Sequence, residues 1–179
     1  MHGLVSLLPE PYYRQVQDFW EILADEHGLR GIHVTPYPHF SWQIAKGYDF
    51  EHLQVIIGEI GLKTPPIRVH TAGLGLFSGN RPVIYVSVVK DPHLMKLHGD
   101  IWQAVQSAAQ GLSPYYAPGD WMPHISLAYE DVTPVNIGPV MQSLAFQSFA
   151  WEMTIDNITL IYEPEGQIGT LKFQIKLTG

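Results

Sequence analysis

The feature that most constrains the fold of this chain is a five-residue pattern that occurs twice. Residues 38–42 read Pro-His-Phe-Ser-Trp, and residues 123–127 read Pro-His-Ile-Ser-Leu. Both segments have the form Pro-His-apolar-Ser-apolar, and side chains two residues apart in a strand point to the same face. Each segment is therefore predicted to be a strand that carries an imidazole and a hydroxyl on one face and two apolar side chains on the other.

The two segments lie about half the chain apart, which predicts two related halves. The apolar faces are expected to point into the core, and they consist of Phe40, Trp42, Ile125 and Leu127. Quasi-symmetric packing of the halves would then bring the two polar faces together across a cleft.

The elements around the two segments are predicted to recur in the same order. The first part is expected to contain strands over 3–8, 32–45, 66–77 and 82–89 and helices over 11–27 and 50–60. The second part is expected to contain helices over 91–109 and 135–146, a loop over 112–120, and strands over 121–129, 149–162 and 170–178. The sequence therefore predicts an α+β fold with an internal duplication, in a single domain that spans residues 1–179.

Composition excludes several classes of protein. Hydrophobic residues make up 46% of the chain and charged residues 15%, as in a folded globular domain. The formal net charge of −7 argues against a protein that coats long nucleic acid, although a local pocket could still bind a small anion. The chain has no cysteine, which excludes a disulfide scaffold and a thiolate nucleophile.

The expected location is the cytoplasm. The N-terminal residues lack the basic region and long apolar stretch of a signal peptide, and no segment has the apolar length that would span a membrane. A monomer is the default expectation for the oligomeric state.

Two imidazoles and two hydroxyls in one cleft suit the chemistry of phosphate esters. A neutral imidazole can take a proton from an attacking water, and a protonated one can give a proton to a leaving ribose oxygen. The unperturbed imidazole pKa lies near neutrality, so both states are accessible. The serine hydroxyls can donate to the phosphate oxygens. The residues therefore predict phosphoester chemistry at His39, Ser41, His124 and Ser126 that requires no metal.

The paired His-x-Ser segments resemble those of the 2H phosphoesterase superfamily, in particular its RNA 2′-5′ ligase-like and cyclic phosphodiesterase branches. The resemblance implies a two-lobed fold, with antiparallel sheets lining a central cleft and helices outside. It also implies that His39 and His124 are catalytic and that Ser41 and Ser126 bind phosphate. The implied substrate is a nucleotide or short RNA with a 2′,3′-cyclic phosphate or a 2′-5′ linkage, and no cofactor is expected. Family members often carry a basic residue after the second motif, whereas this chain has Tyr129.

Four further residues are secondary candidates for substrate binding. Phe77 lies where family members often place an aromatic side chain near the nucleotide base, and stacking there would contribute roughly 1–3 kcal/mol. Arg81 could form a charge-assisted contact with phosphate. Tyr129 and Tyr162 could line the cleft from the second half.

Other readings of the same residues remain open. His93 and His98 are five residues apart, which is not the spacing of a helical zinc pair, so metal-dependent hydrolysis is disfavoured. The chain could instead be a nucleotide-binding module with little turnover, or a structural domain with an inert cleft. Retention of both histidines and both hydroxyls favours the enzyme, because a binding module needs no matched acid and base.

Overall fold

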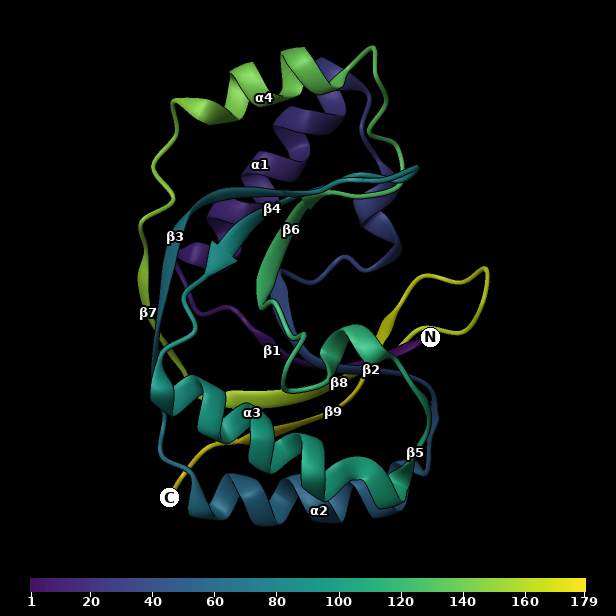
Figure 1. The fold of residues 1–179 in the computed structure, drawn as a ribbon, viewed down its shortest axis with the longest axis vertical. Coiled ribbons are helices and arrows are strands. Elements are labelled where there is room, and N and C mark those ends of the chain that lie inside the picture. The colour runs from purple at the N-terminus through teal and green to yellow at the C-terminus, as the bar shows by residue number, and fades with distance from the viewer.

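The computed structural model describes all of residues 1–179, which form nine strands, four α-helices and three short 3-10 turns (Figure 1). The strands are β1 (His2–Leu7), β2 (His39–Tyr48), β3 (Ile67–Phe77), β4 (Val83–Val88), β5 (Ala109–Leu112), β6 (His124–Ala128), β7 (Glu152–Ile155), β8 (Asn157–Tyr162) and β9 (Thr170–Lys176). The helices are α1 (Tyr12–His27), α2 (Phe50–Lys63), α3 (Pro92–Val105) and α4 (Ile137–Ala145), and the 3-10 turns are η1 (Gly31–Val34), η2 (Gln106–Ala108) and η3 (Pro114–Tyr116).

The strands form two antiparallel sheets, each of which contains one of the repeated motifs. The first sheet has the order β5-β2-β1-β8-β9 and the second has the order β6-β4-β3-β7. His39 begins β2 of the first sheet and His124 begins β6 of the second. The prediction of an α+β fold with two antiparallel lobes is confirmed.

The two lobes exchange strands, so they do not coincide with the two halves of the sequence. Strands β3 and β4 follow the first motif along the chain, but they pair with β6 and β7 in the second sheet. Strands β8 and β9 follow the second motif, but β8 pairs with β1 in the first sheet. Each lobe therefore depends on strands from both halves of the chain.

Three predicted elements differ from the observed ones. The first motif strand begins at His39 and not at residue 32, because residues 31–34 form the turn η1. The helix predicted to end at residue 109 ends at Val105, and the residues after η2 form the short strand β5. The single strand predicted over 149–162 is two strands in different sheets, which separate at Asp156.

Helices cover the outer faces of both sheets. Helices α1 and α4 lie together at one end of the molecule beside the second sheet, and α2 and α3 lie at the other end beside the first sheet (Figure 1). Asp49 accepts a hydrogen bond from the His52 amide and caps α2, while Gly28 ends α1 with a φ of 71°. No helix is both long enough and apolar enough to cross a lipid bilayer.

The apolar faces of the two motif strands form part of the core, as predicted. Their four side chains are fully buried, at 0% exposure: Phe40, Trp42, Ile125 and Leu127. Burial of a side chain of this size stabilises the fold by roughly 1.5–3 kcal/mol. Since side chains alternate along a strand, this packing fixes the direction in which the histidine and serine of each motif point.

Candidate active site

The two motif histidines occupy matching positions in the two sheets. His39 lies opposite Leu7 of β1, and His124 lies opposite Ser87 of β4. Each histidine is the first residue of its strand, so it stands at the end of the sheet and not in its middle. The sequence repeat therefore corresponds to a repeat in space.

The proline before each histidine is fixed to the neighbouring strand in the same way. The carbonyl of Pro38 accepts a hydrogen bond of 3.0 Å from the Leu8 amide. The carbonyl of Pro123 accepts one of 3.1 Å from the Val88 amide. Because proline has no amide proton, its carbonyl is the only main-chain group through which it can join the ladder.

Each imidazole is held by a backbone carbonyl two residues before it. The Nδ1 atom of His39 lies 2.5 Å from the Tyr37 carbonyl oxygen, and the Nδ1 atom of His124 lies 2.7 Å from the Met122 carbonyl oxygen. A carbonyl oxygen only accepts, so Nδ1 carries the proton in both rings. The Nε2 atom of each neutral ring is consequently left free to accept a proton.

Both histidines favour the neutral form in the free protein. Burial lowers the pKa of His39 to about 4; the Tyr37 carbonyl opposes this shift and the nearby His124 ring adds to it. Burial also lowers the pKa of His124, again against the effect of its carbonyl partner, Met122. The His124 ring is therefore near enough to disfavour a positive charge on His39, although the two residues belong to different sheets.

The two motif serines lie on the same faces as the histidines but differ in exposure. Ser41 is buried at 8% exposure, whereas Ser126 is half-buried. The phenol of Tyr116, in the turn η3, interacts with the Ser41 side chain, and burial raises the pKa of Tyr116 to about 12. Tyr116 therefore remains a protonated phenol, which can donate a hydrogen bond beside Ser41.

A tryptophan indole fixes the main chain at each serine. The Nε1 atom of Trp121 donates to the Ser41 carbonyl over 2.9 Å, and the Nε1 atom of Trp20 donates to the Ser126 carbonyl over 3.0 Å. The two tryptophans come from unrelated positions, since Trp121 precedes the second motif and Trp20 lies on α1. The Ser41 carbonyl is therefore held by a side chain that precedes the second motif, and the Ser126 carbonyl by a side chain of the helix beside its own sheet.

Of the secondary candidates, Phe77 is the one that contacts a motif histidine. Its ring centroid lies 4.9 Å from that of His124, with the planes at 89°, and 4.2 Å from that of Tyr85. The Tyr85 ring covers Gly75, where a Cβ atom would come within 2.3 Å of it. A glycine at position 75 is therefore required for Tyr85 and Phe77 to pack beside His124.

Arg81 and Tyr129 lie near the other end of β6. The Arg81 guanidinium forms an ion pair of 2.9 Å with the exposed Glu130, so a contact with phosphate would compete with this carboxylate. Tyr129 is 36% exposed. Its pKa is raised, mainly by partial burial and to a lesser extent by the negative charge of the neighbouring Glu130. Tyr129 is close enough to Tyr116 to contribute to the raised pKa of that phenol.

Tyr162 is not brought to the histidine pair. Its ring stacks on His2 at 4.7 Å between centroids and meets the edge of Phe50 at 5.5 Å. His2 begins β1 and Leu7, opposite His39, ends it. A strand rises about 3.4 Å per residue, so Tyr162 packs roughly 17 Å from the His39 end of the strand.

Two tyrosines at the site were not among the candidates drawn from the sequence. Tyr85 reaches the site because β4 pairs with β6, which places it opposite Ser126. That pairing joins strands from the two halves of the chain, and no pattern in the residues around Tyr85 indicates it. Tyr116 belongs to the tyrosine- and proline-rich segment 112–120, whose composition indicates a loop but does not distinguish Tyr116 from the exposed Tyr115.

The arrangement offers two imidazoles and several hydroxyls to a ligand. Each imidazole has a fixed ring orientation and a free nitrogen, and hydroxyls from Ser41, Ser126 and Tyr116 lie in the same region. No group of three or more histidine, aspartate or glutamate side chains is arranged to hold a metal ion. The residues present can therefore exchange protons with a ligand and donate hydrogen bonds to its oxygens.

Comparison with solved structures identifies the fold. The structure of the Thermus thermophilus protein TT0787 matches over 99% of this chain and 98% of its own, with a TM-score of 0.70 and 16% identity. E. coli LigT, solved in complex with 3′-AMP, matches over 99% of this chain and 98% of its own, with a TM-score of 0.59 and 18% identity. At these identities the likeness establishes the fold alone.

Comparison of sequences identifies the family. A protein of Bacillus cytotoxicus that is provisionally named a phosphoesterase is 26% identical over 148 residues, which cover 79% of this chain and 81% of that protein. The family model of the 2′-5′ RNA ligase superfamily matches residues 8–167, a range that includes both motifs and every strand except β1 and β9. The chain therefore belongs to the 2′-5′ RNA ligase superfamily, within the 2H phosphoesterases.

Proposed function

We propose that this protein is a metal-independent phosphodiesterase that acts on 2′,3′-cyclic phosphates or on 2′-5′-linked nucleotides. The observation that carries the proposal is the matched pair of imidazoles, each with Nδ1 bound to a backbone carbonyl and Nε2 free. A histidine with a purely structural role has no need of an unbonded ring nitrogen. Acid and base catalysis by His39 and His124 does require one, because each ring must exchange a proton on its own side of the phosphorus.

His39 acts as the base in this scheme and His124 as the acid. Burial holds the pKa of His39 at about 4, so its Nε2 is free to accept a proton throughout the neutral range. His124 is less enclosed than His39, and it packs beside the rings of Phe77 and Tyr85 at centroid distances of 4.9 and 5.1 Å. His124 is therefore the ring that carries a proton more readily when an anionic phosphate enters.

The reaction on a cyclic phosphate follows from these roles. Water attacks the phosphorus and transfers a proton to Nε2 of His39, so that a new P–O bond forms. The P–O bond to one ribose oxygen breaks, and that oxygen takes the proton from Nε2 of His124. Ligation of RNA ends would use the same geometry, with a ribose hydroxyl in place of water.

Hydroxyl groups hold the charge of the phosphate. Ser41 and Ser126 donate to the non-bridging oxygens, and Tyr116 supplies a third donor beside Ser41. Arg81, the cation considered above for a contact with phosphate, is already paired with Glu130. Nucleotide substrates are also supported by the relative LigT, whose structures were solved with 3′-AMP and with ATP.

The test is hydrolysis of the four 2′,3′-cyclic mononucleotides in the presence of a chelator. The wild type is compared with His39→Ala and His124→Ala, and with His93→Ala, which removes an exposed histidine of α3 as a control. The proposal expects turnover that survives the chelator, persists in the control and falls by about 10²- to 10⁴-fold in both motif variants.

Two results would contradict the proposal. Turnover that is abolished by the chelator would mean that a metal ion takes part in the reaction. Saturable nucleotide binding without any product from cyclic or 2′-5′-linked substrates, unchanged by His39→Ala, would instead identify a nucleotide-binding module.

A further inference from the structure

The first sheet is discontinuous at the residue that supports His39. Strand β8 pairs with β1 from Gly3 to Val5, where Val5 lies opposite Thr159. Two residues further along β1, Leu7 would lie opposite Asn157, but this is where the chain has just left the second sheet at Asp156. The backbone ladder ends before it reaches Leu7.

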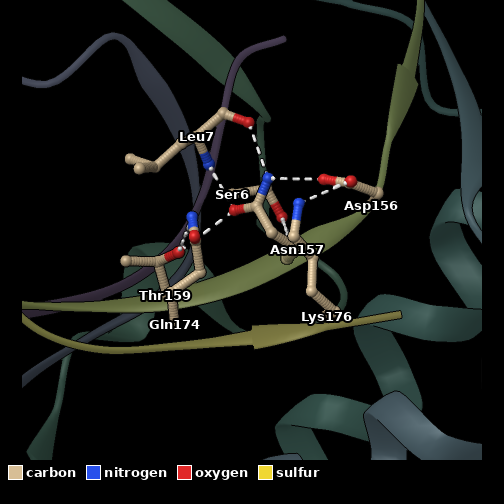
Figure 2. Close-up of polar contacts among 7 residues, drawn as sticks. All are labelled: Ser6, Leu7, Asp156, Asn157, Thr159, Gln174 and Lys176. Carbon is tan, nitrogen blue, oxygen red and sulfur yellow. Dashed lines mark hydrogen bonds and ion pairs between the residues drawn. The ribbon is translucent and has the colours of Figure 1, made fainter. Parts of the chain in front are cut away.

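The Asn157 side chain takes the place of the missing strand (Figure 2). Its Oδ1 atom accepts a hydrogen bond of 2.9 Å from the Leu7 amide, and its Nδ2 atom donates one of 3.0 Å to the Leu7 carbonyl. A carboxamide has the same donor and acceptor as a peptide group, so one side chain satisfies both main-chain groups of Leu7. Asn157 is 5% exposed, and water therefore does not compete for these bonds.

Leu7 in turn determines where the backbone of His39 lies. The two residues face each other in the β1–β2 ladder, and the adjacent Leu8 amide bonds to the Pro38 carbonyl. On its other side, β2 pairs with β5 only from Ala45 to Tyr48. At His39, strand β1 is therefore the only neighbour of β2, and Asn157 is the group that fixes β1 there.

Further hydrogen bonds hold the Asn157 carboxamide in this orientation. Thr159 donates its hydroxyl proton to Oδ1 over 3.0 Å, and Gln174 of β9 donates to that hydroxyl over 3.2 Å (Figure 2). The Asn157 main-chain carbonyl accepts from the Ser6 hydroxyl, which itself accepts from Nε1 of Trp42 over 2.8 Å. The network thus connects β1, β8 and β9 to Trp42, the residue that follows Ser41.

The second sheet has no such side chain at the equivalent place. Ser87 is the counterpart of Leu7 and lies at the register shift of the β3–β4 ladder, and the residues after it bond to β3 through the main chain. Val88 lies opposite Thr71, and the Val89 amide donates to the His70 carbonyl over 2.9 Å. A carboxamide replaces the ladder only in the first lobe, at the point where the chain passes from β7 to β8.

We propose that Asn157 is a positioning residue for His39, which it holds through Leu7 at the distance from the substrate that proton transfer requires. The kinetic part of this inference rests on the proposed function, whereas the placement of the His39 ring does not. Misplacement of a catalytic group by about 1 Å can lower a rate by roughly 10²-fold. Loss of the carboxamide should therefore affect turnover at His39 more than binding of the ligand.

The test compares Asn157→Leu with Thr159→Val. The first variant keeps the branched shape of the side chain and removes both bonds to Leu7, while the second removes only the hydroxyl behind the carboxamide. Imidazole NMR signals of His39 and His124 are recorded during a pH titration, together with kcat and KM on a 2′,3′-cyclic mononucleotide.

In Asn157→Leu we expect the His39 signals and its titration midpoint to shift while those of His124 stay in place. We also expect kcat to fall by about 10- to 100-fold with KM within about twofold of wild type. Thr159→Val leaves both bonds between Asn157 and Leu7 in place, so it should shift the His39 signals and lower kcat clearly less than Asn157→Leu does. If Asn157→Leu does not fold, Asn157→Asp keeps the acceptor for the Leu7 amide, loses the donor to the Leu7 carbonyl and should shift the same His39 signals.

Unchanged His39 signals in a folded Asn157 variant would overturn the inference. Equal shifts of His39 and His124, or equal effects of Thr159→Val, would also overturn it, because the network would then support the fold as a whole. If no substrate is turned over by wild type, the NMR comparison still decides the positioning role, and only the proposed function fails.

Discussion

The two motif strands begin with the same residues but place their histidines in different surroundings. His39 begins an interior strand of the first sheet, and its burial lowers its pKa to about 4. His124 begins an edge strand of the second sheet and packs against the rings of Phe77 and Tyr85. Burial lowers the pKa of both imidazoles and the Nδ1 hydrogen bond is the same in both lobes, so the lobes differ in the side chains that surround each ring.

The supports behind the motifs show the same divergence. Both serine carbonyls accept an indole proton, from Trp121 in one lobe and from Trp20 in the other. The strand beside each histidine is fixed by a carboxamide in the first lobe and by the main chain in the second. The two lobes therefore reach equivalent geometry through different residues. A mutation in one of these supports should affect the motif of one lobe and leave the other unchanged.

The largest expected difference between the lobes is their response to acid. Burial lowers the pKa of His98, which stacks on Trp121 at 3.8 Å behind the first motif, to about 4. Because the unfolded chain binds a proton near pH 6.5 and the folded chain does not, stability falls as the pH drops from about 6.5 towards 4. At pH 4.5 this single group should cost roughly 2–3 kcal/mol of unfolding free energy.

Urea unfolding of wild type and His98→Phe at pH 7 and pH 4.5 measures this effect. The variant is expected to be less stable than wild type at pH 7, because it loses the contact of the imidazole with the Trp42 carbonyl, and to lose less stability on acidification. An identical pH dependence in the two proteins would contradict the low pKa of His98.

The next largest effect should come from the hydroxyls. Ser41→Ala and Ser126→Ala are each expected to lower kcat/KM by roughly 10- to 100-fold, since a hydrogen bond to a charged group contributes about 1.5–3 kcal/mol. The two lobes differ in that Tyr116 interacts with Ser41. Combining Tyr116→Phe with Ser41→Ala should therefore be non-additive, while combining it with Ser126→Ala should be close to additive.

Double-mutant cycles on kcat/KM distinguish these cases. Additivity in both cycles would mean that the phenol and the Ser41 hydroxyl bind the substrate independently. Equal coupling to both serines would place Tyr116 between the lobes and not in the first one.

The smallest effect is expected at the aromatic side of the second lobe. Phe77→Leu removes the ring that meets His124 at 89° but keeps an apolar side chain. An aromatic pair contributes about 0.5–1.5 kcal/mol beyond its buried area, so kcat/KM should fall roughly two- to tenfold. Steady-state kinetics with four different bases would show whether the loss is uniform; a loss larger than that of either serine variant would show that Phe77 has a greater role than packing beside His124.

The sequence predicts the motif strands well and the long-range pairing poorly. The alternation of polar and apolar residues in 38–42 and 123–127 correctly assigns the buried faces, because burial follows from strand periodicity. Asp156 and Asn157 are residue types that strands disfavour, so the sequence carries a local signal for a break that the prediction of one strand over 149–162 did not use. The sheet that each part joins depends on distant partners. Tyr85 and Asn157 were missed for this reason, as both matter only through strands from the other half of the chain.

The secondary candidates show how far a resemblance extends. Phe77 lies beside His124, whereas Tyr162 packs against His2 at the distant end of β1. Arg81 is engaged by Glu130 two residues beyond the second motif strand. The distance of a residue from a motif along the chain therefore does not give its distance in space. The reason is that β3 and β4 pair in the sheet of the second motif, while β8 pairs in the sheet of the first.

The central claim is that His39 and His124 act as one acid–base pair, and the pH dependence of kcat/KM tests it most directly. Burial lowers both pKa values below the usual 6.5, and catalysis needs one ring protonated and the other neutral. The account predicts a bell-shaped profile with its maximum on the acidic side of pH 6.5, whose limbs belong to the pair. A profile that is flat between about pH 5 and 9, or that rises continuously into the alkaline range, would contradict it.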